Sequence, residues 1–153
     1  MANSIHDFHD DPRNAGILIW MNGRLTPRAE AMVSVFDSGF VLGDGVWEGL
    51  RVVDGQPVFL DEHLDRLFEG AKAIAMDIGL DRAGLLAAIR ETLAANRMHD
   101  GVHLRLMVTR GIKRTPYQDP RVTVGPATVV IIPEFKTAKP ETLATGLSLF
   151  TVH

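Results

Sequence analysis

The stretch Phe36-Asp37-Ser38-Gly39-Phe40-Val41-Leu42-Gly43-Asp44-Gly45-Val46-Trp47-Glu48-Gly49-Leu50-Arg51 carries most of the information about the fold. Successive side chains of a strand point to opposite faces, so Trp47, Gly49 and Arg51 share one face of the extended run that follows Gly45. An aromatic ring, a glycine and an arginine in a row are typical of a pocket wall. A strand with one solvent face, in which Trp47 is a partly exposed packing residue, explains the same spacing.

A second short stretch, His63-Leu64-Asp65-Arg66-Leu67, lies downstream on a predicted helix. The planar guanidinium of Arg66 matches the oxygens of a phosphate or carboxylate. His63 lies one turn earlier, where a hydrogen bond can orient Arg66. A solvated arginine that pairs with a neighbouring acid explains the same position.

The flanking sequence predicts further strands and turns. Apolar residues 16–20 indicate a strand, and Asn22-Gly23 is a strong hairpin signal. Residues 31–36 continue as a predicted strand. Asp54-Gly55 predicts a turn into another strand over residues 57–60.

Two helices are expected after these strands. Asp61 is placed to cap the first, whose apolar residues recur at helical spacing at Leu60, Leu64, Leu67, Ala71, Ile74 and Ile78. Asp81 is placed to cap the second, with Leu85, Leu86, Ile89 and Leu93 facing inward. Strands are expected at 103–109 and, buried in the centre of the sheet, at 128–132, with a polar loop at 111–125 between them. This order of strands and helices predicts an α+β fold with a mostly antiparallel sheet and two helices.

We expect four segments along the chain. Residues 1–14 are predicted to form a flexible leader without a metal site, and residues 15–133 a small domain. Residues 134–145 are predicted to link it to residues 146–153, the first strand of a large domain that is otherwise absent. A final strand that closes the sheet of the small domain is the alternative.

Composition narrows the class of protein. The net charge is -3 and the sequence pI is about 6.0, which gives no basic field for nucleic acid. No apolar run is long enough to span a bilayer, and the acidic start is unlike a signal peptide. The chain contains no cysteine, which excludes disulfide scaffolds and fits a cytoplasmic enzyme.

The two motifs together, in this order and at this distance, resemble the class IV, or fold type IV, pyridoxal-phosphate enzymes. These include the branched-chain and D-amino-acid aminotransferases and aminodeoxychorismate lyase. The resemblance implies the small N-terminal domain of that fold, pyridoxal 5'-phosphate as cofactor, and a homodimer. It implies transfer of an amino group between an amino acid, with the branched-chain type favoured, and a 2-oxo acid.

The resemblance also implies roles for individual residues. Arg66 matches the arginine that binds the cofactor phosphate, and Trp47 matches the aromatic residue that lines the pocket for the substrate side chain. Arg105 matches an arginine that can receive a distal carboxylate. Strand geometry places Arg51 near the same pocket, and Phe40 is also expected there. Tyr117 lies in a loop that often reaches the neighbouring subunit's active site, and a plain surface loop is the alternative reading.

Three positions depart from the family pattern. His103 stands where the branched-chain enzymes commonly have a tyrosine. Leu42 stands where some of them have a second tyrosine. Arg114-Thr115-Pro116 lacks the histidine of the D-amino-acid enzymes' signature. A D-amino-acid or amine transaminase and aminodeoxychorismate lyase therefore remain alternatives.

None of the four lysines, Lys72, Lys113, Lys136 and Lys139, matches the lysine that forms the Schiff base in this family. We expect that lysine to follow His153. These residues then contain no catalytic group, and the chain is expected to be the inactive N-terminal part of an enzyme. A non-catalytic binding or dimerisation domain is the alternative.

Overall fold

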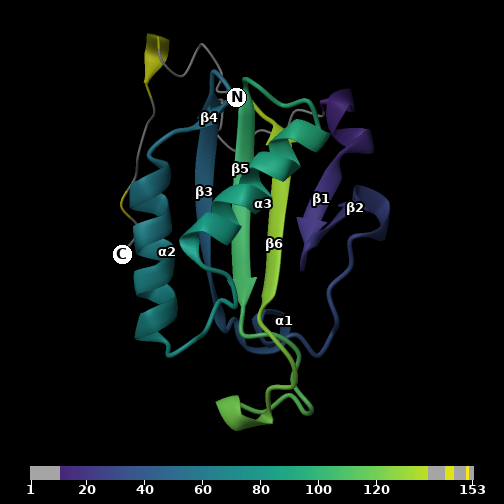
Figure 1. Ribbon diagram of the computed structural model, residues 1–153, viewed down its shortest axis with the longest axis vertical. Coiled ribbons are helices and arrows are strands. Elements are labelled where there is room, and N and C mark those ends of the chain that lie inside the picture. The colour runs from purple at the N-terminus through teal and green to yellow at the C-terminus, as the bar shows by residue number, and fades with distance from the viewer. Residues whose placement is uncertain (1–10, 138–143, 147–150, 152–153) are drawn as a thin grey trace.

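The computed structural model describes residues 11–137, 144–146 and 151. Its centre is a six-stranded antiparallel sheet with the strand order β2-β1-β6-β5-β3-β4 (Figure 1). The strands are β1 (Leu18–Met21), β2 (Arg24–Pro27), β3 (Gly45–Val53), β4 (Gln56–Pro57), β5 (Val102–Thr109) and β6 (Thr128–Phe135). The expected α+β fold with a mostly antiparallel sheet is confirmed.

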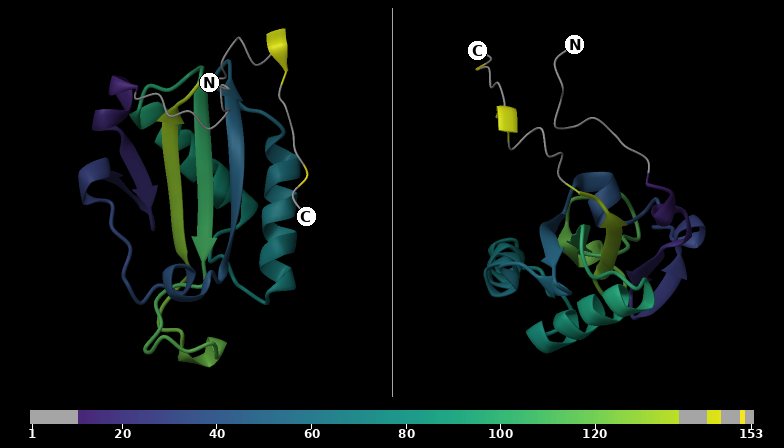
Figure 2. Two further views of the ribbon diagram at one scale, coloured as in Figure 1. Left: turned by 180° about the vertical axis from the view of Figure 1, so that it is seen from behind. Right: turned by 90° about the horizontal axis from the view of Figure 1, so that it is seen from above.

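The helices are short α1 (Ser38–Leu42) and the longer α2 (Leu60–Ala73) and α3 (Arg82–Ala95). Three 3-10 turns complete the elements, η1 (Pro12–Gly16), η2 (Arg28–Glu30) and η3 (Pro120–Val122). Helix α3 crosses one face of the sheet, and α2 runs alongside β3 (Figure 2). No helix among the described residues is long and apolar enough to cross a membrane.

The core lies between the sheet and the two long helices. Alternate residues of β3 and β5, such as Leu50, Leu104 and Leu106, are completely buried on this side. They pack with Leu85 and Ile89 of α3 and with other buried apolar residues of one cluster. Trp20 belongs to the same cluster, and its indole Nε1 donates a 2.9 Å hydrogen bond to Glu91 on α3. The helices therefore cover only one face of the sheet.

Both predicted hairpin turns are confirmed. Asn22 and Gly23 have φ of 49° and 91°, and they join β1 to β2. Asp54 and Gly55 have φ of 50° and 72°, and they join β3 to β4. Positive φ at both central residues is the requirement of the type I′ turn, which matches the twist of the flanking strands.

The predicted strand at residues 31–36 is wrong. The strand that pairs with β1 is β2, and the chain then turns through η2 and leaves the edge of the sheet. No strand described here pairs with the outer edge of β2, and residues 31–36 lie outside the sheet. The predicted strand at residues 57–60 is also shorter than expected, because Phe59 adopts the left-handed conformation and α2 begins at Leu60.

The caps of the helices differ in how well they were predicted. Helix α2 begins after Phe59, which makes no side-chain cap, so Asp61 lies in the first turn and is not the cap. The prediction for Asp81 is confirmed, because its carboxylate accepts a 2.7 Å hydrogen bond from the backbone N–H of Gly84. Helix α1 was not predicted, and Asp37 caps it by accepting from Gly39 N–H at 2.8 Å.

Most of the outer segments of the chain lie outside the described residues, including residues 1–10 of the expected leader and 138–143 of the expected linker. The expected strand over residues 146–153 lies outside them as well, except for residues 146 and 151. Residues 11–14 belong to η1 and its cap, and Asn14 exchanges two hydrogen bonds with the backbone of Phe135. Residues 11–14, which were expected to belong to the flexible leader, therefore pack against the end of β6.

Candidate functional site

The sheet face that α2 and α3 leave bare carries a cluster of chemically active side chains. Strand β3 contributes Trp47, Gly49 and Arg51, and β5 contributes His103 and Arg105. Gly49 is the register partner of Arg105, and Arg51 is the register partner of His103. We call these five residues the open face. The structure thus brings together three of the predicted substrate-binding residues, Trp47, Arg51 and Arg105.

Arg105 is held against Trp47 on the open face. Its guanidinium carbon lies 4.8 Å from the centroid of the indole ring, within the range of a cation–π contact. Trp47 is 60% exposed, which is unusual for a large aromatic residue of a sheet. The pair presents an apolar surface and a positive charge side by side, so it can contact both an apolar group and a carboxylate.

His103 lies over the backbone of Gly49. A Cβ atom at Gly49 would come within 3.0 Å of His103 Nε2, so the absence of a side chain there makes room for the imidazole. Burial lowers the pKa of His103, and the nearby charges of Arg51, Lys136 and Arg105 lower it further. Arg51 is itself anchored, because its Nη1 donates a 2.5 Å hydrogen bond to the carbonyl of Lys136.

Arg66 is fixed by a buried carboxylate of β3. Its Nε donates to Glu48 Oε1 at 2.6 Å and its Nη2 donates to Glu48 Oε2 at 2.5 Å. His63 Nδ1 lies 2.7 Å from the same Oε2. Glu48 is only 4% exposed, and the hydrogen bonds from Arg66, followed by those from His63, keep its pKa below the ordinary value although burial alone would raise it.

Sequence reasoning placed Glu48 on the face opposite Trp47 but gave it no function. The expected orienting contact between His63 and Arg66 is present at 3.2 Å, but Glu48 is the group that holds both side chains. The signal that could have found it is a carboxylate on the inward face of a strand, which needs a buried partner. The Glu48 side chain points to the helix side of β3, so the structure does not place Arg66 on the open face.

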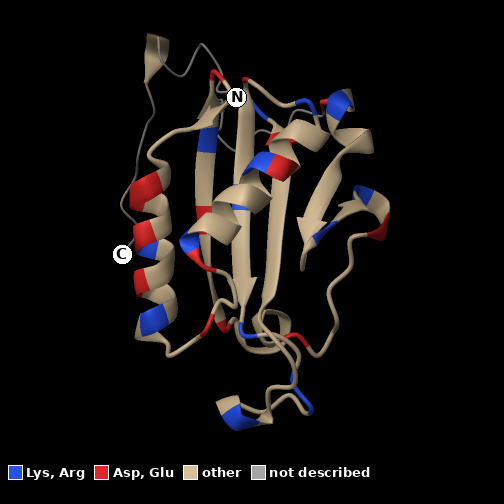
Figure 3. Cartoon of the chain, viewed as in Figure 1, with Lys and Arg blue, Asp and Glu red and all other residues tan. Residues whose placement is uncertain are grey.

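The geometry of Arg66 fits a phosphate ligand. Its side chain is 69% exposed, and Glu48 occupies the Nε and Nη2 atoms, which leaves Nη1 without a partner among the described residues. A guanidinium held along one edge and open along the other is well prepared for a charge-assisted contact with an anion. Most other charged residues of α2 are acidic, and the one remaining basic residue, Lys72, lies in its last turn (Figure 3).

Phe40 and Tyr117 are not brought to the open face by any described contact. Their side chains are 74% and 65% exposed, on α1 and on the loop that joins β5 to β6. Both elements lie at the end of the sheet where β3 begins (Figure 1). Their roles at the substrate remain predictions.

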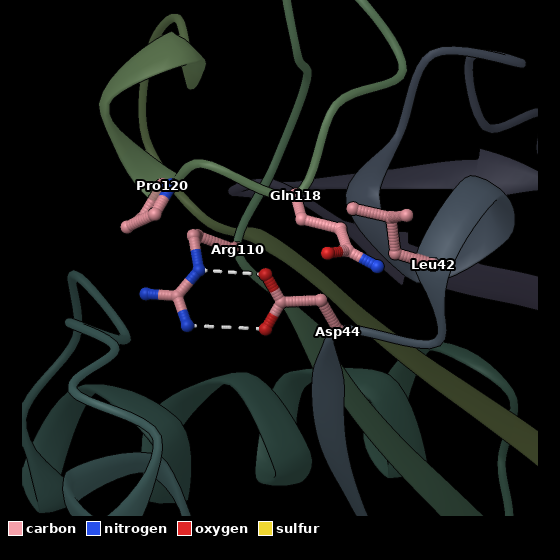
Figure 4. Close-up of a pocket in the computed structure, with 5 residues that line it drawn as sticks. All are labelled: Leu42, Asp44, Arg110, Gln118 and Pro120. Atoms are coloured by element: carbon pink, nitrogen blue, oxygen red, sulfur yellow. Dashed lines mark hydrogen bonds and ion pairs between the residues drawn. The ribbon is translucent and has the colours of Figure 1, made fainter.

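A pocket of about 280 Å³ lies at this same end, lined by Leu42, Asp44, Arg110, Gln118 and Pro120 (Figure 4). Arg110 makes two hydrogen bonds to the Asp44 carboxylate, at 2.7 and 3.0 Å. It also donates to the carbonyls of Ile74 and Ala75 at the end of α2. Arg110 is thus fully used in joining β3, α2 and β5, and sequence reasoning did not identify it.

The lysines that the structure describes lie away from the open face or at its margin. Lys72 is exposed on α2, and Lys136 follows β6. Lys113 is buried, and its Nζ donates to the carbonyl of Asp119 at 3.2 Å, which pins the loop between β5 and β6. Lys139 lies outside the described residues.

Comparison with known proteins connects this geometry to a family. The family model described as Amino-transferase class IV matches residues 45–152. The branched-chain-amino-acid aminotransferase-like protein 1 of Arabidopsis thaliana is 45% identical over 125 residues, which is 82% of this chain and 22% of that protein. The chain therefore spans about a fifth of the length of this relative.

Solved structures share the fold. A branched-chain amino acid aminotransferase from T.th., solved with pyridoxamine 5'-phosphate, aligns with a TM-score of 0.72 and 29% identity over 82% of this chain and 41% of that one. The 4-amino-4-deoxychorismate lyase from Pseudomonas aeruginosa aligns with a TM-score of 0.64 and 32% identity, over 82% of this chain and 42% of that one.

Proposed function

The chain belongs to the class IV aminotransferase family, and on this premise we propose that it binds pyridoxal 5'-phosphate and contributes one wall of a substrate pocket. The observation that carries the proposal is the arrangement of Arg66, a guanidinium fixed by buried Glu48 and open to solvent on its other edge. When bound, the cofactor supplies an electron sink through which an amino group can move between an amino acid and a 2-oxo acid.

In this proposal Arg66 binds the phosphate of the cofactor. A phosphate dianion needs a charge-assisted donor, and Glu48 holds Arg66 so that little side-chain freedom is lost on binding. The buried carboxylate has a second effect, because its negative charge offsets the positive charge of Arg66 and leaves the pair with no net charge. Further contacts to a doubly charged phosphate must then come from other groups.

The open face would bind the substrate side chain. The indole of Trp47 offers apolar area for a branched aliphatic group, and Arg105 beside it offers a donor for a second carboxylate. A transaminase has to accept an amino acid and the 2-oxo acid of another in one pocket, and this pair serves both kinds of side chain. We favour the branched-chain type of substrate on this ground.

The test is the affinity for pyridoxal phosphate, measured by absorbance titration of the intact protein. Replacing Arg66 by alanine removes a charge-assisted hydrogen bond, so we expect about 10- to 100-fold weaker binding. The affinity of Arg66→Lys should lie between those of the wild type and Arg66→Ala. Arg90→Ala removes another exposed arginine, on α3, and serves as the control. Equal affinities of Arg66→Ala and Arg90→Ala would contradict the role of Arg66 in phosphate binding.

We also propose a homodimer in the cytoplasm. The segment from residue 31 to α1 supports the dimer, because large apolar side chains stand exposed there without cover, namely those of Met32, Val33, Val35, Phe36 and Phe40. Sedimentation of the intact protein tests this, and a monomer at micromolar concentration would refute it. The Schiff-base lysine expected after His153 remains a prediction.

A further inference from the structure

His103 is the titratable group at the centre of the open face. Arg51 stands directly opposite it on β3, and Arg105 lies two residues further along β5. Glu134 is its register partner on β6, and Lys136 follows that strand. Two arginines and a lysine therefore surround the imidazole, and Glu134 is the single acid among these neighbours.

The position of the ring is set by the backbone of β3. Gly49 provides the space, since a Cβ atom there would lie 3.0 Å from Nε2 and 3.6 Å from Cε1 of His103. The imidazole thus lies across β3 and close to Arg51 and Arg105 at the same time. Neither of its nitrogens hydrogen-bonds to any residue that the structure describes.

Burial and the surrounding charges favour the neutral form of this ring. Burial lowers the His103 pKa, as do Arg51, Lys136 and Arg105, and Glu134 acts in the opposite direction. An anion between the two arginines would raise the His103 pKa, because it offsets their charge and can accept a hydrogen bond from the protonated imidazole.

We propose that His103 is a specificity-determining residue that forms, with Arg51 and Arg105, a site for the second carboxylate of a dicarboxylic substrate, and that this site binds the carboxylate more tightly as the pH falls. The inference rests on the proposed substrate pocket and deepens it. Acid would favour dicarboxylic over apolar 2-oxo acids, since only the former place a negative charge at His103. Glu134 works against the carboxylate, which makes the added charge of His103 more important.

Binding of two probes decides the question. The intact protein in its pyridoxal-phosphate form holds no amino group to give to a 2-oxo acid, so 2-oxoglutarate and 4-methyl-2-oxopentanoate can be titrated by calorimetry without turnover. We expect the affinity ratio of the first probe to the second to rise about tenfold between roughly pH 8 and pH 5.5. In His103→Gln, which cannot be protonated, the ratio should change only through ionisation of the probes.

A second histidine supplies the control. His99 is exposed beside the turn between β3 and β4 and is paired with Asp100 at 2.7 Å, so His99→Gln should keep the full pH response. An NMR titration of the His103 ring gives a readout that needs no variant. By linkage, 2-oxoglutarate should raise the His103 pKa and 4-methyl-2-oxopentanoate should not.

The outcomes separate this inference from the proposed function. If pyridoxal phosphate binds but His103→Gln retains the wild-type pH response, or 2-oxoglutarate leaves the His103 pKa unchanged, the inference is wrong and the proposed function stands. If pyridoxal phosphate does not bind, the proposed function fails, and the same titrations on the cofactor-free protein decide the role of His103.

Discussion

Glu48 and Arg66, 18 residues apart in sequence, are joined by two parallel hydrogen bonds of 2.6 and 2.5 Å that connect β3 to α2. The carboxylate is buried and the guanidinium is largely exposed. The pair therefore has two functions at once, since it holds α2 against the sheet and turns one edge of Arg66 toward solvent.

Glu48→Gln should weaken the binding of pyridoxal phosphate although Glu48 does not touch it. An amide can accept only one of the two hydrogen bonds from Arg66 and carries no charge, so the guanidinium is held less firmly. We expect an affinity about five- to tenfold lower in an absorbance titration. Asp65→Asn on the same helix removes an acid that pairs with Arg82 in an exposed salt bridge, and it should leave the affinity unchanged.

The same pair predicts an acid-sensitive fold. The hydrogen bonds from Arg66 lower the Glu48 pKa in the folded protein. At a pH between the folded and unfolded pKa values, the folded state therefore binds fewer protons than the unfolded state. The stabilisation is complete above the unfolded pKa of about 4.3 and is lost as the pH falls through the lower folded value. Urea unfolding between about pH 7 and pH 3 should show a smaller loss of stability in Glu48→Gln than in the wild type. Equal losses would mean that Glu48 does not contribute.

Gly49→Ala should displace His103 with little effect on stability. The new methyl group would meet the far end of the imidazole at 3.0 Å, and that ring can rotate away. We expect a cost below about 1 kcal/mol in chemical denaturation, together with changed NMR shifts of the His103 ring. Gly16→Ala, where a methyl group would meet nothing within 4 Å, is the matched control. An unchanged His103 spectrum would show that Gly49 does not set the position of the ring.

Asp37→Ala should be strongly destabilising. One carboxylate oxygen caps α1 through Gly39 N–H, and the other accepts a 2.7 Å hydrogen bond from the buried hydroxyl of Thr128. Loss of the cap and of the buried bond together should cost about 2–4 kcal/mol of unfolding free energy. Ser34→Ala, which removes an exposed hydrogen bond to Phe36 N–H, should cost less than about 0.5 kcal/mol. Similar costs for both variants would contradict a buried structural role for Asp37.

The Asp119 carboxyl should titrate far below the ordinary range. The side-chain and backbone hydrogen bonds from Arg121 lower its pKa to about 2. Arg121→Gln removes the charged donor, and the Asp119 pKa should then rise toward the ordinary value in a carbon-detected NMR titration. A value that does not change in the variant would assign the shift to another neighbour.

The sequence predicted the elements that local chemistry determines. Asn22-Gly23 specifies its turn by the backbone conformations it tolerates, and Asp81 caps α3 through an N–H three residues away. Alternation along β3 was sufficient to place Trp47 and Arg51 on one face. Each of these predictions depends on residues within one turn or one strand.

What the sequence did not predict depends on distant partners. Residues 31–36 have the composition of a strand, but the chain turns away through η2 and leaves the free edge of β2 unpaired. The function of Glu48 depends on α2 packing beside β3, and the hydrogen bonds of Arg110 join three elements that no local pattern relates. Lys113 is buried because the loop folds back over it. Nothing in the sequence indicated this, since lysines are mostly exposed.

The two tryptophans of this chain differ in environment, so their fluorescence can report on the open face. Trp20 is sealed in the core and bonded to Glu91, whereas Trp47 stands in solvent with Arg105 across its ring. Iodide should quench the emission of the second and spare the first. Of these two emissions, that of Trp47 should change when a ligand draws Arg105 away from the indole, and that of Trp20 should not.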